Sequence, residues 1–124
     1  MIPDKIKESI ISIFPEENTL AIIIFGSYGT ERQTDISDID IAWIPKKKVP
    51  ITELVVKTES LKNVLDINVD LKIVTENYTI ALRKSIFEGE VIYESKEFKD
   101  YINEFYIENS DVIDILNWRD MHGN

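Results

Sequence analysis

Residues 26–40 read GSYGTERQTDISDID, and this stretch decides the fold of the chain. It begins with a Gly-Ser pair and ends, ten residues further on, with an Asp-x-Asp pair. The apolar run of residues 20–25 leads into the Gly-Ser pair, and a second run, residues 38–44, begins with the aspartates. Both runs are rich in isoleucine and have the length of a buried strand. The stretch therefore predicts one strand that delivers the Gly-Ser pair and a second strand that carries the acidic pair.

The acidic pair has the arrangement of a metal site. Successive side chains of a strand point to opposite faces, so Asp38 and Asp40 share one face of the second strand. The other face is apolar: Ile39, Ile41, Trp43. Adjacent carboxylates repel each other unless a cation lies between them, and hard oxygen ligands suit Mg²⁺. Gly26 and Ser27 offer a closely approaching backbone and a hydroxyl donor for phosphate oxygens, so the combination indicates nucleotide chemistry.

A third carboxylate lies on a later strand. Residues 67–74 alternate in polarity, with apolar side chains on one face and Asn68, Asp70 and Lys72 on the other. If this strand lies beside the strand of residues 38–44, Asp70 joins the acidic pair. Three carboxylates on neighbouring strands can hold one or two Mg²⁺ ions and leave room for a triphosphate and an attacking hydroxyl group.

The spacing of Gly26-Ser27, Asp38-x-Asp40 and a later strand aspartate resembles the nucleotidyltransferase fold of the DNA polymerase β superfamily. At 124 residues the chain looks like a minimal nucleotidyltransferase. Members of that group are typically antitoxins (MntA-type) encoded beside a HEPN-domain ribonuclease toxin. The resemblance covers roughly residues 1–93. Glu31 departs from the family pattern, which often has glycine there, and this bears on the loop near the phosphates.

The resemblance implies a magnesium-dependent enzyme that moves AMP from ATP to a hydroxyl group and releases pyrophosphate. Gly26 and Ser27 would hold the β- and γ-phosphates, and Asp38 and Asp40 would hold Mg²⁺. Asp70 would orient the acceptor hydroxyl group and help to bind a second metal ion. The implied acceptor is a tyrosine of the HEPN toxin, with which the chain would form a hetero-oligomer. An added phosphodiester would block a basic RNA-cutting site with charge and bulk.

Other interpretations remain open at this point. The chain could be an antitoxin that neutralises its toxin by contact alone, or a small-molecule nucleotidyltransferase of the antibiotic-modifying type. At the level of residues, Asp38 and Asp40 could be an acidic loop-to-strand boundary, and Asp70 could lie on the exposed side of an edge strand. Ser27 could be a helix cap. Lys72 could steady a phosphate or form a structural ion pair, and Arg32 could reach a phosphate or lie in solvent.

Length and composition favour one domain spanning residues 1–124, with a core of residues 1–93 and an acidic helical part of residues 94–124. There are no cysteines, so disulfides and thiolate metal sites are excluded. The N-terminal residues are too charged for a signal peptide, and no apolar run approaches the length of a membrane span. We therefore expect a cytoplasmic protein.

The acidic charge is unevenly distributed. The formal net charge is −9, which argues against direct nucleic-acid binding. Residues 90–124 hold nine Asp and Glu against three Lys and Arg, a net of −6. This segment is either a solvated helical face or a docking surface for a basic partner, such as a ribonuclease toxin. The lysines of residues 46–48 are interpreted as a soluble loop.

The remaining patterns predict an α/β (α+β) fold, a small mixed sheet of three to four strands flanked by helices. Besides the strands at 20–25, 38–44 and 67–74, a short extended segment is expected at 91–93. Helices are expected at 3–14, 27–33, 51–64, 77–88, from about 98 to 105, and from Ser110 onward. Gly89 is interpreted as the C-terminal cap of the helix at 77–88. Tyr101, Phe105 and Tyr106 are expected in the core or at a subunit contact.

Overall fold

Four strands form one mixed sheet in the computed structural model, which describes residues 2–26 and 38–122. The strands are β1 (Thr19–Phe25), β2 (Ile39–Pro45), β3 (Val69–Ile73) and β4 (Glu90–Glu94), in the order β3-β2-β1-β4. β1 is antiparallel to both of its neighbours, and β2 and β3 are parallel. The mixed four-stranded sheet confirms the fold class expected from the sequence.

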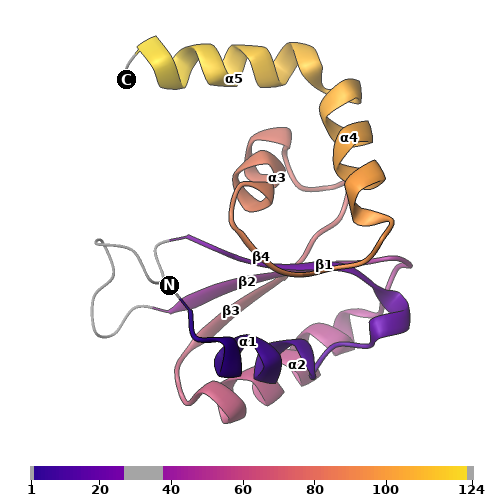
Figure 1. Cartoon of the computed structure of the whole chain (residues 1–124), viewed down its shortest axis with the longest axis vertical. Helices are drawn as coiled ribbons and strands as arrows, with labels where there is room; N and C mark the ends of the chain where they lie inside the picture. The colour runs from indigo at the N-terminus through magenta and orange to yellow at the C-terminus, as the bar shows by residue number, and fades with distance from the viewer. Residues whose placement is uncertain (1, 27–37, 123–124) are drawn as a thin grey trace.

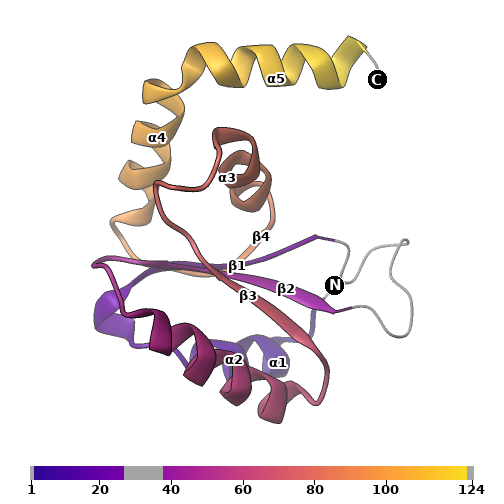
Figure 2. The ribbon, with the colours of Figure 1, turned by 180° about the vertical axis from the view of Figure 1, so that it is seen from behind.

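The helices cover both faces of the sheet. α1 (Asp4–Ile11) and α2 (Ile51–Leu65) lie on one face, and α3 (Ile80–Phe87) and α4 (Phe98–Glu108) on the other (Figures 1 and 2). A short 3₁₀ turn, η1 (Glu16–Asn18), leads into β1. α5 (Ser110–His122) packs on α3 and α4, farther from the sheet.

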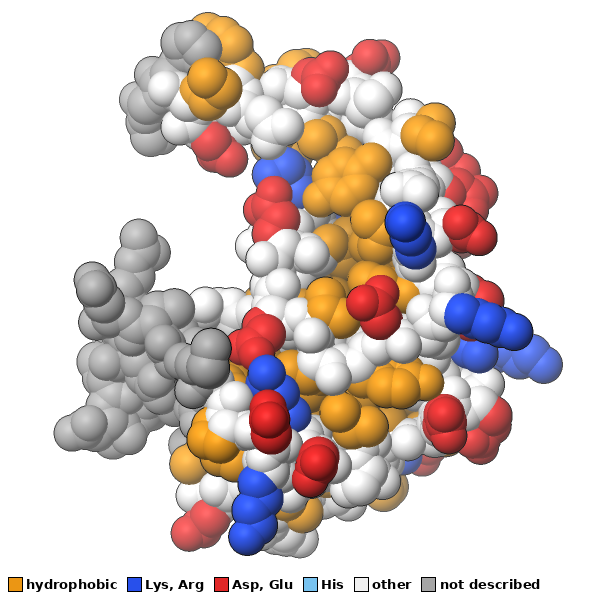
Figure 3. All heavy atoms as spheres, viewed as in Figure 1, with side chains coloured by type: hydrophobic (Ala, Val, Ile, Leu, Met, Phe, Trp, Pro, Cys, Tyr) orange, Lys and Arg blue, Asp and Glu red, His pale blue; other side chains and the backbone are white. Residues whose placement is uncertain are grey.

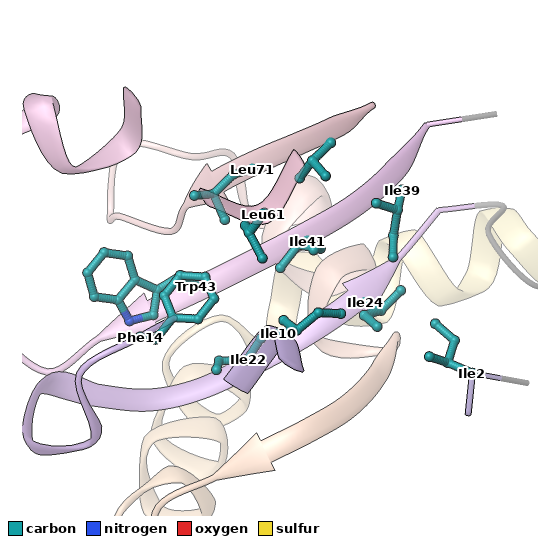
Figure 4. Close-up of a cluster of buried hydrophobic side chains, with 11 residues drawn as sticks. Ile2, Ile10, Phe14, Ile22, Ile24, Ile39, Ile41, Trp43, Leu61 and Leu71 are labelled. Carbon is teal, nitrogen blue, oxygen red and sulfur yellow. The ribbon is translucent and has the colours of Figure 1, made fainter. Parts of the chain in front are cut away.

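Both faces of the two central strands are buried, because apolar side chains point to each face in turn. The face toward α1 and α2 carries the first cluster, which is drawn in Figure 4: Ile2, Ile10, Phe14, Ile22, Ile24, Ile39, Ile41, Trp43, Leu61, Val69 and Leu71. The face toward α3 and α4 carries the second: Ala21, Ile23, Ala42, Ile44, Val74, Ile86, Phe87, Phe98, Phe105 and Ile113. The sheet is thus the rigid centre of the molecule, and polar groups reach solvent at its ends.

One buried polar network closes the end of the sheet where β1 begins. The indole Nε1–H of Trp43 donates to Thr19 Oγ1 at 3.1 Å, and that hydroxyl group donates to the Pro15 carbonyl oxygen at 2.6 Å. Both groups are fully buried, so each needs its partner. This network lies at the opposite end of β1 from Gly26.

The bounds predicted for α1 and α3 differ from the structure. The first helix ends at Ile11 rather than near Pro15, with Ser12 as its cap. The third helix begins at Ile80 rather than near residue 77, because the Thr79 hydroxyl group accepts a hydrogen bond from the Leu82 backbone at 3.1 Å and caps the helix there. The helix expected at 27–33 lies outside the described residues.

The interpretation of Gly89 as the C-terminal cap of α3 is wrong by one residue. Glu88 is the cap residue of α3, and among the described glycines only Gly26 has a positive φ. A Cβ atom at position 89 would instead lie 2.6 Å from the backbone oxygen of Ile24. Glycine is therefore needed there so that the chain can pass close to β1.

Candidate active site

Gly26, Asp40 and Asp70 lie together at one end of the sheet, where β1 ends and β2 and β3 begin. Antiparallel pairing places Phe25, the last residue of β1, opposite Asp40. Parallel pairing places Asp40 directly beside Asp70 of β3. The structure therefore brings together two of the three predicted carboxylates, although 29 residues separate them in the sequence.

Gly26 lies against the carboxyl group of Asp40. Its backbone has φ of 79°, and a Cβ atom built on it would collide with Asp40 Oδ2. Glycine is required at this position both for the left-handed conformation and for the close approach. The end of β1 thus offers bare backbone beside a carboxylate. Ser27, the other member of the predicted phosphate-binding pair, lies outside the described residues, as does Arg32.

Burial and neighbouring charges raise the pKa of Asp40 above its usual value. Burial of the carboxyl group is the largest cause, followed by the charge of Asp70. The charge of Lys72 opposes the rise, while a hydrogen bond with Asp70 and the charge of Asp38 add to it. The ionised form of Asp40 is therefore disfavoured, and a cation placed here would relieve the repulsion.

Lys72 is a cation that the described part of the fold places at the site. Its Nζ atom donates to Asp70 Oδ2 at 3.4 Å, and the side chains of Lys72 and Asp70 are 30% and 48% exposed. This is the ion pair that the sequence left as one of two options for Lys72. Both side chains are partly exposed to solvent, which weakens the attraction between their charges, so the pair by itself contributes little to stability.

Asp38 is exposed and immediately precedes β2. Across residues 2–26 and 38–122, no three acidic or histidine side chains come close enough to hold a metal ion between them. The adjacent Asp40–Asp70 pair is therefore the part of the predicted triad that the structure assembles. Carboxylate oxygens are the donors that Mg²⁺ prefers, so the donor type and the mutual repulsion both fit that ion.

The contact between Gly26 and Asp40 is the one feature of this site that sequence reasoning did not identify. The sequence indicated Gly26 only as a partner for phosphate. A glycine that ends a strand and precedes an acidic strand is a weak signal of such a contact, because only the pairing register shows which residue it faces.

Comparison with known proteins places this site in a family. The model of the family "Polymerase beta, Nucleotidyltransferase" matches residues 8–98, and the chain belongs to this family. A relative from Methanocaldococcus jannaschii that carries the name of a protein adenylyltransferase is 36% identical over 73 residues. That match covers 59% of this chain and 74% of the relative.

Solved structures share the fold over most of their length. A mutant of the toxin–antitoxin complex MntA-HpeT matches with a TM-score of 0.62 and 19% identity, over 93% of this chain and 98% of that one. A toxin–antitoxin structure with AMP-PNP matches with a TM-score of 0.62 and 21% identity, over 89% and 97%. A complex of a tri-AMPylated Shewanella oneidensis HEPN toxin with its MNT antitoxin matches with a TM-score of 0.59 and 19% identity, over 92% and 98%. These likenesses confirm the nucleotidyltransferase fold.

No helix among the described residues is both long enough and apolar enough to cross a membrane.

Proposed function

We propose that the chain is a magnesium-dependent adenylyltransferase that moves AMP from ATP to a hydroxyl group of a partner protein. The observation that carries the proposal is the parallel register of β2 and β3, which sets Asp40 beside Asp70 at the strand end where Gly26 leaves β1. Membership of the nucleotidyltransferase family supports the reaction class. The name of the M. jannaschii relative supports AMP as the transferred group and a protein as the acceptor.

We assign each predicted site residue a role within this proposal. Asp40 and Asp70 would hold Mg²⁺ together. Asp38 forms no three-carboxylate cluster with them in the described residues and would contribute to a two-ion site by moving toward them. When bound, the metal neutralises the charge of the triphosphate and of the leaving pyrophosphate. Gly26 and Ser27 would hold the β- and γ-phosphates through the backbone and hydroxyl group. Asp70, the more exposed carboxylate of the adjacent pair, would orient the acceptor hydroxyl group.

The partner in this proposal is a HEPN toxin, and the acceptor is one of its tyrosines. Complexes of this kind are named among the similar structures, one of them with an AMPylated toxin and another with an ATP analogue. The chain would then act as an antitoxin. The acidic surface of α4 and α5 is the proposed contact for the partner, because a ribonuclease needs a basic surface to bind RNA.

Transfer of label from α-³²P-ATP tests this function. The purified chain is incubated with Mg²⁺ and the HEPN-domain protein expected from its gene neighbourhood, and label on that protein is counted. Asp40→Asn and Asp70→Asn should each lower transfer by at least about 100-fold, since each removes a charged metal ligand. Glu59→Gln, an exposed carboxylate on α2, serves as the matched control and should transfer at the wild-type rate.

Two outcomes would contradict the proposal. Transfer of label by Asp40→Asn at the wild-type rate would contradict the proposal that Asp40 binds the metal ion. A wild-type chain that binds the HEPN protein and suppresses its ribonuclease activity, yet transfers no label, would show an antitoxin that acts by contact alone.

A further inference from the structure

The Lys72 side chain reaches the Asp40–Asp70 pair from a position two residues farther along β3 than Asp70. β3 is an edge strand, and its period of two puts Asp70 and Lys72 on the same face. In the parallel register Asp70 lies beside Asp40, whereas Lys72 lies beside Ala42, one step farther from the strand end. The Lys72 side chain therefore has to extend back along the strand to place its Nζ atom 3.4 Å from Asp70 Oδ2.

The ammonium group of Lys72 acts on both members of the carboxylate pair. It forms an ion pair with Asp70, and its charge also counteracts the rise in the pKa of Asp40. A divalent ion bound by the same two carboxylates would meet this positive charge at close range. Lys72 and a bound metal therefore compete for the same oxygens.

A nucleotide changes that competition because its phosphate chain supplies new negative charge beside the pair. Lysine is a flexible point charge on a four-carbon stem, so its ammonium group can change partners without movement of the backbone. The Lys72 side chain is 30% exposed, and the only partner that the structure gives its ammonium group, among the described residues, is Asp70. An ammonium group that leaves Asp70 can then contact a phosphate oxygen.

We propose that Lys72 is a positioning residue with two ion-pair partners. Before the metal–nucleotide complex binds, its ammonium group neutralises the Asp40–Asp70 pair. After binding, the side chain swings away from Asp70 and the ammonium group contacts a phosphate oxygen of the nucleotide. This inference rests on the proposed function and extends it to the order of binding. Lys72 makes binding of metal alone unfavourable and binding of metal with nucleotide favourable. Metal and nucleotide binding are thereby coupled through one side chain.

The chain contains a closely matched control for this inference. Lys46 forms an ion pair with Glu97 at 3.4 Å, with side chains 32% and 46% exposed. The distance and exposure nearly equal those of Lys72 and Asp70. Lys46 directly follows β2, however, and so lies at the far end of that strand from Asp40. Lys72→Met and Lys46→Met each remove one comparable surface ion pair, and only the first lies at the site.

The experiment measures binding rather than turnover. Mn²⁺, a paramagnetic ion with the same preference for carboxylate oxygens, is titrated alone and followed by electron paramagnetic resonance. α,β-Methylene-ATP, whose α–β linkage cannot be cleaved, is then titrated by calorimetry in the presence of Mn²⁺. Thermal melts of wild type, Lys72→Met, Lys46→Met and Lys72→Arg show that each variant is folded.

Lys72→Met should bind Mn²⁺ alone about threefold more tightly than wild type and bind the nucleotide with Mn²⁺ about threefold more weakly, as expected for a partly exposed charge. Lys46→Met should match wild type in both titrations, and Lys72→Arg should restore nucleotide affinity. If Lys72→Met behaves like Lys46→Met, the ion pair is purely structural and the inference is overturned. If Lys72→Met binds Mn²⁺ more tightly but binds the nucleotide with unchanged affinity, the inference is also overturned, because the Lys72 ammonium group then makes no contact with the phosphates.

Failure of the proposed function gives a different result. A wild-type chain that binds no nucleotide in the presence of Mn²⁺ would overturn both the function and the inference. Wild-type binding with no difference between the two methionine variants would overturn the inference alone.

Discussion

At the scale of single residues, Asp40 is the most constrained side chain of the site. Its carboxyl group is flanked by Asp70 across the sheet and by Gly26 at the end of β1, where any side chain would collide with it. Burial and the neighbouring carboxylates raise its pKa. The folded chain is therefore less stable with Asp40 ionised, and a cation bound beside the carboxyl group, as proposed above, would offset this cost.

Asp40→Asn should stabilise the metal-free protein at neutral pH. The folded pKa of Asp40 lies above the ordinary value of 3.8, so wild type loses stability as the pH rises through the interval between these two values. Asparagine does not ionise, so the variant avoids this loss. Its free energy of unfolding should exceed that of wild type by up to about 1 kcal/mol, or roughly 4 °C in Tm, because the group is partly solvated. Thermal melts in EDTA from pH 3 to pH 8 measure it. The advantage should vanish below about pH 3.8, and an advantage that grows on acidification would contradict the assigned direction.

At the scale of elements, α2 positions one of the two adjacent carboxylates. It is the whole crossover between the parallel strands β2 and β3, and it packs directly on β3. Its C-terminus is capped by Asp66, whose φ of 56° turns the chain sharply toward β3. The packing of α2 therefore holds the register in which Asp70 lies beside Asp40.

Leu61→Ala should destabilise the protein by about 2–5 kcal/mol, because Leu61 is fully buried in the first cluster and its removal leaves a cavity under the sheet. Val55→Ala on the same helix is the control, since Val55 is 63% exposed and its truncation should change stability by less than about 0.5 kcal/mol. Urea unfolding followed by circular dichroism compares the two. Equal midpoints would show that α2 does not depend on this contact.

At the scale of the whole molecule, acidic and apolar side chains occur together on the outer surface of α4 and α5. Figure 3 shows both kinds on the visible part of these helices. Ile107, Ile115 and Met121 are 75%, 59% and 81% exposed, and the exposed acids include Glu104 and Glu108. Exposed apolar side chains beside charges are typical of protein-binding surfaces. This is the surface that we propose for the HEPN partner.

Reversing two charges on this surface should slow association with the partner. Glu104→Lys with Glu108→Lys should lower the association rate constant about tenfold at low salt, while nucleotide affinity stays unchanged. The wild-type rate should fall as salt increases, since the screening length shortens to about 8 Å at physiological ionic strength. Glu16→Lys with Glu17→Lys makes the same change in net charge near η1 and should have a much smaller effect. Surface plasmon resonance that shows equal rates for both double variants would exclude a specific docking surface here.

Local hydrophobic patterns in the sequence predicted most of the fold. The isoleucine-rich runs predicted β1 and β2 to within one residue, and the alternation of residues 67–74 predicted which face of β3 carries Asp70 and Lys72. The helix expected at 51–64 is also confirmed as α2, in which Leu61 is buried and Leu54 and Leu65 pack against the same cluster. These features depend on strand and helix periods, which a short window of sequence contains.

Where prediction failed, the cause was a contact with a distant part of the chain. Gly89 was assigned to a helix end, but its requirement for glycine comes from the backbone oxygen of Ile24 on β1. The start of α3 was predicted too early because Thr79 was not recognised as the residue that caps it. The hydrogen bond from the Leu82 backbone to the Thr79 hydroxyl group depends on a side-chain rotamer and not on hydrophobic periodicity. Both corrections concern geometry that propensity and pattern do not encode.

The sequence by itself indicated the chemical groups of the candidate site, because the residue types and their spacing along three predicted strands single out a glycine, a serine and three aspartates. Only the tertiary structure decided that Asp40 and Asp70 face each other, that Gly26 touches Asp40 and that Lys72 neutralises Asp70. The physical reason is register. Local alternation indicates the face of β3 that carries Asp70, but it does not indicate the residue of β2 beside which Asp70 lies. That pairing is set by the packing of α2 and of both apolar clusters.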